Sequence, residues 1–142
     1  MSEHWIEVYK LQYERIGQHE NQRLNFSNLV LVSSCAALAL GAGLKGEQNF
    51  FSACYLALLV VAINVVAIIH AGKARFWVKF HQAKARELLR SYDTKLLSVL
   101  GRTPKPDSNK DYMRRPELQK ILHGVFVILA IMFPLIVHLG SA

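Results

Sequence analysis

Three long stretches of the chain contain no charged residue, and this feature limits what the chain can fold into. They span residues 24–44, 48–72 and 121–142 of a 142-residue sequence. A helix of about 20 apolar residues crosses the ~30 Å hydrocarbon core of a bilayer. The remaining pieces, residues 1–23 and 73–120, are too short to bury a large core of their own. The sequence therefore predicts an all-α integral membrane protein with three transmembrane helices and argues against a soluble enzyme with an enclosed cleft.

The same sequence predicts a single membrane domain, residues 1–142, whose first two crossings form an antiparallel hairpin extended into the cytoplasm. No proline interrupts residues 3–43 or 48–100, so each of these crossings is expected to continue as a cytoplasmic helix. The expected order is a cytoplasmic helix (3–24), a first crossing (25–44), a second crossing (49–72), a basic cytoplasmic helix (73–100), a linker (101–115) and a third crossing (116–140).

Charge is distributed unevenly and predicts the orientation. The net charge is +7, and 13 of the 17 Lys and Arg residues lie within residues 73–120. Cytoplasmic segments of membrane proteins carry an excess of Lys and Arg. We therefore expect a multi-pass protein of a cell inner membrane with its N-terminus in the cytoplasm and its C-terminus outside, and we expect no nucleic-acid partner. The basic residues predicted at the membrane edge are Arg23, Lys73, Arg75 and Lys79.

Both cytoplasmic helices carry an apolar stripe at helical spacing, so we expect them to pack against each other. The stripe of the second helix includes Ala85 and Leu89. Acidic residues of the first helix should face basic residues of the second, although each exposed ion pair contributes only ~0–1 kcal/mol. The stripe of the first helix consists of Trp5, Tyr9, Tyr13 and Ile16.

Small and polar residues inside the crossings predict close helix packing. Asn64 lies about as far from the cytoplasmic end of its crossing as Ser33 and Ser34 do, so a hydrogen bond between them is expected, worth ~0.6–2 kcal/mol. Asn64 either fixes the hairpin within one subunit or faces an oligomer axis and lines a polar path. The small-residue faces are Ser33, Ala37 and Gly41 in the first crossing and Ala53, Ala57, Val60, Asn64, Ala67 and Ala71 in the second.

Motifs for enzymatic chemistry are almost absent from the sequence, so we expect no cofactor, no metal site and no catalytic residue. His70, His123 and His138 lie near the ends of crossings, where we expect interfacial positions without a ligand role. The one candidate catalytic pair is Arg75 and His81, whose Arg-x5-His spacing resembles the pattern of HEPN ribonucleases. Six residues turn a helix by ~600°, so these two side chains should point in different directions.

Two features resemble known bacterial membrane proteins. Residues 9–16, Tyr-Lys-Leu-Gln-Tyr-Glu-Arg-Ile, and residues 21–26, Asn-Gln-Arg-Leu-Asn-Phe, resemble the start of RipA-family octameric membrane proteins. Across residues 5–100, a leading helix, two close crossings and a long cytoplasmic helix resemble the plan of SLATT proteins. The resemblance implies a bacterial homo-oligomer that forms a pore or perturbs the membrane as an antiphage defence effector.

Three functions remain open from the sequence. The first is the homo-oligomeric pore, with Ser33, Ser34 and Asn64 as its pore or packing residues. The second is a non-conducting scaffold whose basic helix recruits a cytoplasmic protein or anionic lipid. The third is a membrane-tethered HEPN-like ribonuclease using Arg75 and His81.

Overall fold

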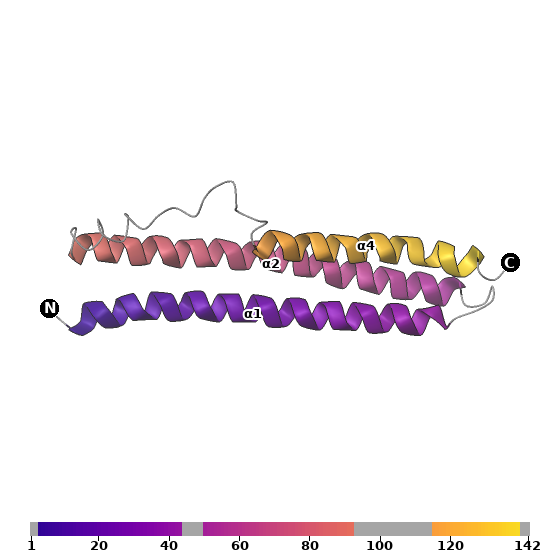
Figure 1. Ribbon diagram of the computed structural model, residues 1–142, viewed down its shortest axis with the longest axis horizontal. Coiled ribbons are helices and arrows are strands. Elements are labelled where there is room, and N and C mark those ends of the chain that lie inside the picture. The colour runs from indigo at the N-terminus through magenta and orange to yellow at the C-terminus, as the bar shows by residue number, and fades with distance from the viewer. Residues whose placement is uncertain (1–2, 44–49, 93–114, 140–142) are drawn as a thin grey trace.

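The computed structural model describes residues 3–43, 50–92 and 115–139, and all regular secondary structure in these ranges is α-helical. Helix α1 spans Glu3–Ala42, helix α2 spans Phe50–Tyr92 and helix α4 spans Arg115–Leu139 (Figure 1). Each is long and apolar enough to cross a membrane. The predicted all-α class with three such helices is confirmed for the described part of the chain.

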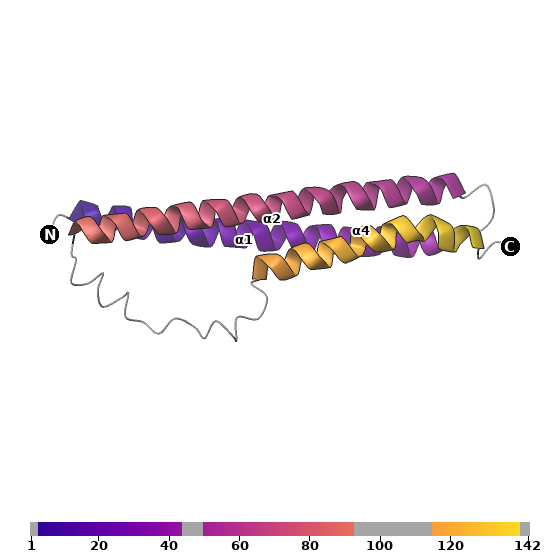
Figure 2. The same ribbon diagram turned by 90° about the horizontal axis from the view of Figure 1, so that it is seen from above.

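Helices α1 and α2 lie side by side and run in opposite directions (Figures 1 and 2). Helix α4 lies along the half of α2 that is near the C-terminal end of α1 (Figure 1). It packs mainly against α2 and makes fewer contacts with α1. One end of the molecule is therefore a three-helix bundle, and the other end is a two-helix pair that we call the α1–α2 extension.

The helix ends agree closely with the predicted ones. Helix α1 ends one residue before its predicted limit, where the backbone N–H of Gly43 donates to the Leu40 carbonyl at 3.2 Å. Helix α4 begins one residue early, and its Pro116 lies in the first turn, where a missing N–H costs no helical hydrogen bond. The segment 93–100, predicted to prolong α2, and most of the linker 101–115 lie outside the described residues.

Small side chains of α2 form the centre of the packing. All six residues of its predicted face are buried, and the face continues along the extension through Ala74 and Ala85. Their spacing of three and four residues places them on one side of the helix. Small residues let helix backbones approach closely. Gly41 shows the same effect on α1, because a Cβ atom there would lie 2.5 Å from the Phe133 ring of α4.

The predicted small-residue face of α1 is partly wrong. Ser33 is exposed, whereas the neighbouring Ser34 is fully buried. Adjacent residues differ by about 100° around a helix, so only one of the two serines can face the bundle. The buried face of α1 consists of Arg23, Ser27, Val30, Ser34 and Gly41.

The α1–α2 extension is held together differently from the prediction. The predicted stripe through Tyr13 is only partly a packing face. Tyr13 is 55% exposed, whereas Tyr9 and Ile16 are half-buried and Trp5 lines a pocket with residues of α2. Gln12 and His19 contact α2: Gln12 Oε1 lies 2.8 Å from His81 Nδ1, and the His19 ring stacks on Trp77 with centroids 6.1 Å apart. Among the described side chains, no ion pair joins α1 to α2, so the expected pairing of opposite charges is not seen.

Large apolar side chains point outward around the bundle. Exposing so many of them to water is unusual for a soluble monomer, whereas lipid tails solvate them well. More than half of each of these side chains is exposed: Leu29, Val32, Leu58, Val66 and Ile128.

Candidate functional site

Four polar side chains from three helices form a connected hydrogen-bond network inside the bundle. Asn64, Ser34 and His123 are completely buried, and Ser27 is 4% exposed. The Asn64 amide nitrogen lies 2.7 Å from Ser34 Oγ, and its amide oxygen lies 2.7 Å from His123 Nδ1. The other ring nitrogen of His123, Nε2, lies 2.8 Å from Ser27 Oγ. Within this network, each pair of helices is thus linked by one side-chain hydrogen bond.

Two backbone carbonyls determine the direction of donation in this network. Ser34 donates to the Val30 carbonyl at 2.7 Å, and the Asn64 amide nitrogen donates to the Val60 carbonyl at 2.8 Å. Ser34 Oγ therefore accepts from Asn64, and Asn64 Oδ1 accepts from the protonated Nδ1 of His123. In the neutral imidazole, Nε2 then accepts from the Ser27 hydroxyl. All four side chains satisfy one another without a ligand.

The network confirms one prediction and corrects another. The predicted bond from Asn64 to the Ser33–Ser34 pair is formed with Ser34. The predicted interfacial position of His123 is wrong, because its ring is completely buried. It lies on the face of α4 that also buries Ala130 and Phe133, and partners on α1 and α2 offset the cost of burying both nitrogens.

The geometry of the network is that of a structural lock. Interhelical hydrogen bonds in membrane proteins contribute ~0.6 kcal/mol each on average and rarely exceed ~2 kcal/mol. These hydrogen bonds fix the positions of the three helices along their axes, because a shift of any helix would leave buried donors and acceptors without partners. Within one chain, Asn64 and Ser34 have no exposed surface, so neither side chain lines a polar path.

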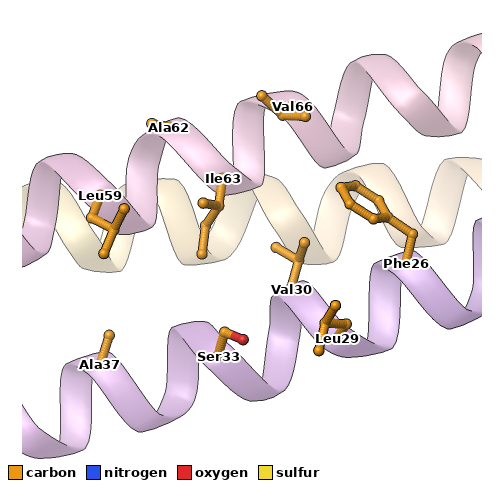
Figure 3. Close-up of a pocket in the computed structure, with 9 residues that line it drawn as sticks. All are labelled: Phe26, Leu29, Val30, Ser33, Ala37, Leu59, Ala62, Ile63 and Val66. Atoms are coloured by element: carbon orange, nitrogen blue, oxygen red, sulfur yellow. The ribbon is translucent and has the colours of Figure 1, made fainter.

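Ser33 occupies a different environment. It lies in an open apolar groove of about 470 Å³ between α1 and α2. Figure 3 shows Leu59 and Ile63 of α2 pointing across this groove toward Ala37 and Ser33 of α1, with α4 behind them.

The candidate catalytic pair is not brought together. The guanidinium of Arg75 contacts the Glu117 carboxylate of α4 at 2.7 Å, whereas His81 contacts Gln12 of α1. The pKa of His81 is lowered below its ordinary value, mainly because burial disfavours the charged ring, and further because His19, Lys84 and Arg15 are nearby.

The predicted membrane-edge basic residues fall into two environments. Lys73 and Lys79 are exposed, and Arg75 is partly exposed in its ion pair with Glu117. Arg23 is only 5% exposed, and its Nε atom has no hydrogen-bond partner among the described residues. The sequence did not distinguish Arg23 from the other three.

The remaining histidines have aromatic neighbours. The centroids of the His70 and Phe26 rings lie 4.7 Å apart. The His138 and Phe50 rings meet edge-on, with their centroids 5.7 Å apart.

Sequence reasoning missed Ser27, although a signal was present. Ser27 precedes Ser34 by seven residues, which is two helical turns, so both lie on the same side of α1.

Within the described ranges, no group of three or more His, Cys, Asp or Glu side chains is placed to hold a metal ion. Comparison with protein-family models, curated proteins and solved structures finds no match to this chain.

Proposed function

We propose that this chain is a multi-pass protein of a bacterial inner membrane that acts as a non-conducting scaffold. In this proposal the three-helix bundle lies in the bilayer, and the α1–α2 extension projects into the cytoplasm and recruits an acidic partner. The N-terminus is then cytoplasmic and the C-terminus external. The concentration of Lys and Arg in residues 73–120 supports this orientation.

One observation carries the scaffold proposal. The basic side chains of α2 in the extension are exposed, and none of them pairs with an acidic residue of α1 among the described side chains. Such a concentration of exposed cations attracts an acidic surface over roughly a Debye length. The polar groups of the bundle meanwhile hydrogen-bond to one another, which argues against a water-filled path through a single chain. The exposed cations of α2 in the extension are Lys79, Lys84, Arg86 and Arg90.

A matched pair of charge reversals tests the scaffold. Arg86→Glu with Arg90→Glu should abolish co-purification of the cytoplasmic partner, whereas Lys10→Glu with Arg15→Glu on α1 should leave it intact. Wild-type proteoliposomes should show no ion flux. Retention of every partner by the first variant, or flux through the wild-type protein, contradicts the scaffold. Reporters fused after Leu100 and after Ala142 test the orientation, because only the first should be active in the cytoplasm.

We propose a homo-oligomeric pore, acting in antiphage defence, as the second candidate. The open groove lined by Ser33 and Ala37 supports it, because small residues admit a helix of another copy. Filling the groove by Ser33→Leu should then reduce the particle mass in detergent and stop ion leakage. Leu38→Val, outside the groove, is the matched control. A monomeric wild-type particle contradicts this candidate.

A further inference from the structure

A cleft lies at the end of the bundle that adjoins the α1–α2 extension, where all three helices meet. Its volume is about 310 Å³, and its polar lining comes from Glu20 and Arg23 of α1 and from Arg75, Lys79 and Gln82 of α2. Pro116, in the first turn of α4, closes it on the third side. The cleft is separate from the apolar groove of Figure 3, with which it shares no residue.

Arg23 is the unusual member of this lining. The residue is only 5% exposed, yet its Nε atom has no hydrogen-bond partner in the part of the chain that the structure describes. Neither Glu20 nor any other described carboxylate forms an ion pair with it. The buried Nε–H donor of this guanidinium has lost its water and gained no acceptor among the described residues, which costs free energy. An anion that enters the cleft would supply the acceptor that the Arg23 guanidinium lacks.

Other charges around the cleft favour the same kind of ligand. Lys79 is exposed and free to turn inward, while Arg75 is held in place by Glu117 and keeps further N–H donors. The start of α4 adds the positive end of its helix dipole. Glu20 is the one opposing charge of the lining, and it is exposed, so it can turn toward solvent.

The position of the cleft selects the source of the anion. Arg23 directly precedes the first uncharged stretch, Arg75 follows the second by three residues, and Pro116 precedes the third by five. If these stretches cross the bilayer, the cleft lies at the depth of the phosphate groups of the inner leaflet. Arginine binds phosphate with several parallel N–H donors, and such charge-assisted bonds are strong.

We infer that this cleft binds the phosphate headgroup of an anionic phospholipid, with Arg23 as the central ligand and Arg75 and Lys79 as supporting cations. The inference rests on the membrane placement proposed above but not on the scaffold role. Lipid binding at this site would seal the junction of the three helices and fix the depth of the protein in the inner leaflet.

Native mass spectrometry of the full chain in detergent tests the inference. Phosphatidylglycerol should bind the wild-type chain with about tenfold higher affinity than phosphatidylcholine, and Arg23→Gln should lose about tenfold in phosphatidylglycerol affinity. Arg86→Gln removes the same charge from an exposed site and should leave the affinity unchanged. Arg23→Lys keeps the cation and should fall between wild type and Arg23→Gln, which guards against a variant that only misfolds.

Three outcomes overturn the inference. Equal losses in Arg23→Gln and Arg86→Gln would mean that lipid binding follows overall charge alone. Equal affinity for the two lipids would remove the preference for a net negative headgroup. Displacement of phosphatidylglycerol by inorganic phosphate at the same concentration would assign the cleft to a soluble anion. Because the scaffold is tested by Arg86 and Arg90, its failure is distinguishable from failure here.

Discussion

The imidazole of His123 in α4 donates from Nδ1 to the amide oxygen of Asn64 in α2, 2.7 Å away, while the same amide group donates to Ser34 in α1. Asn64 is therefore the hub of the network, since it contacts both neighbouring helices. His123 also hydrogen-bonds to Ser27 of α1 through its second ring nitrogen, Nε2. One amide side chain and one imidazole therefore connect all three helices.

Replacing Asn64 by leucine should destabilise the bundle without preventing insertion into a membrane. The change leaves His123 Nδ1 and Ser34 Oγ short of a buried partner, at a cost of about 1–2 kcal/mol. Thermal unfolding in detergent measures this cost. Val65→Leu, one residue from Asn64 on an exposed face, is the matched control and should leave the midpoint nearly unchanged. Equal midpoints for Asn64→Leu and wild type would remove the network as a structural lock.

The bond between Ser27 and His123 should appear as a coupling energy in a double-mutant cycle. Ser27→Ala in the wild-type background should cost about 0.5–1.5 kcal/mol of unfolding free energy. In a His123→Phe background the same change should cost almost nothing, since the acceptor nitrogen is gone. Additive losses in the double variant would show that the two side chains act independently.

The fold was largely predictable because its main signals are local. Uncharged length identified the three apolar helices, and Pro and Gly positions located the end of α1 and the start of α4 to within a few residues. The face of α4 was not predictable, because a helix that is apolar on every side offers no pattern to distinguish packing from lipid contact. His123 was assigned to an interface for the same reason: nothing in the local sequence shows that two other helices supply its partners.

The extension shows a second limit. The aromatic stripe through Tyr13 has the correct helical period, but Tyr13 itself does not pack against α2, because two helices touch only along a narrow seam. The structure fills that seam with Gln12, His19 and His81, whose contacts depend on the partner helix. Arg23 illustrates a related limit: its place just before the first uncharged stretch is visible in the sequence, whereas its burial depends on how the helices pack.

Close packing of Gly41 against Phe133 should make this position intolerant of larger side chains. Gly41→Val places new atoms where the ring lies and should cost about 1–3 kcal/mol of stability. Adding Phe133→Ala should recover part of the loss by making room. Gly17 is the matched control: nothing lies within 4 Å of a Cβ atom there, so Gly17→Ala should stabilise α1 by about 0.5–1 kcal/mol. A Gly41→Val variant as stable as wild type would contradict the packing.

Acidification should loosen the α1–α2 extension. The pKa of His81 lies below its ordinary value of 6.5 when α1 and α2 are paired, so the separated helices bind a proton more readily than the paired ones. Pairing is therefore fully stable above that ordinary value and weakens as the pH falls through the lowered pKa. His19, Arg15 and Lys84 lie near the ring and oppose its protonation.

Spin labels at positions 10 and 86, in a chain without Cys35 and Cys54, should report a broader distance distribution at about pH 5 than at about pH 8. His81→Gln removes the titrating ring and should flatten this response, whereas His138→Gln, which lies far from the extension, should preserve it. An unchanged response in His81→Gln would assign the pH dependence to another group.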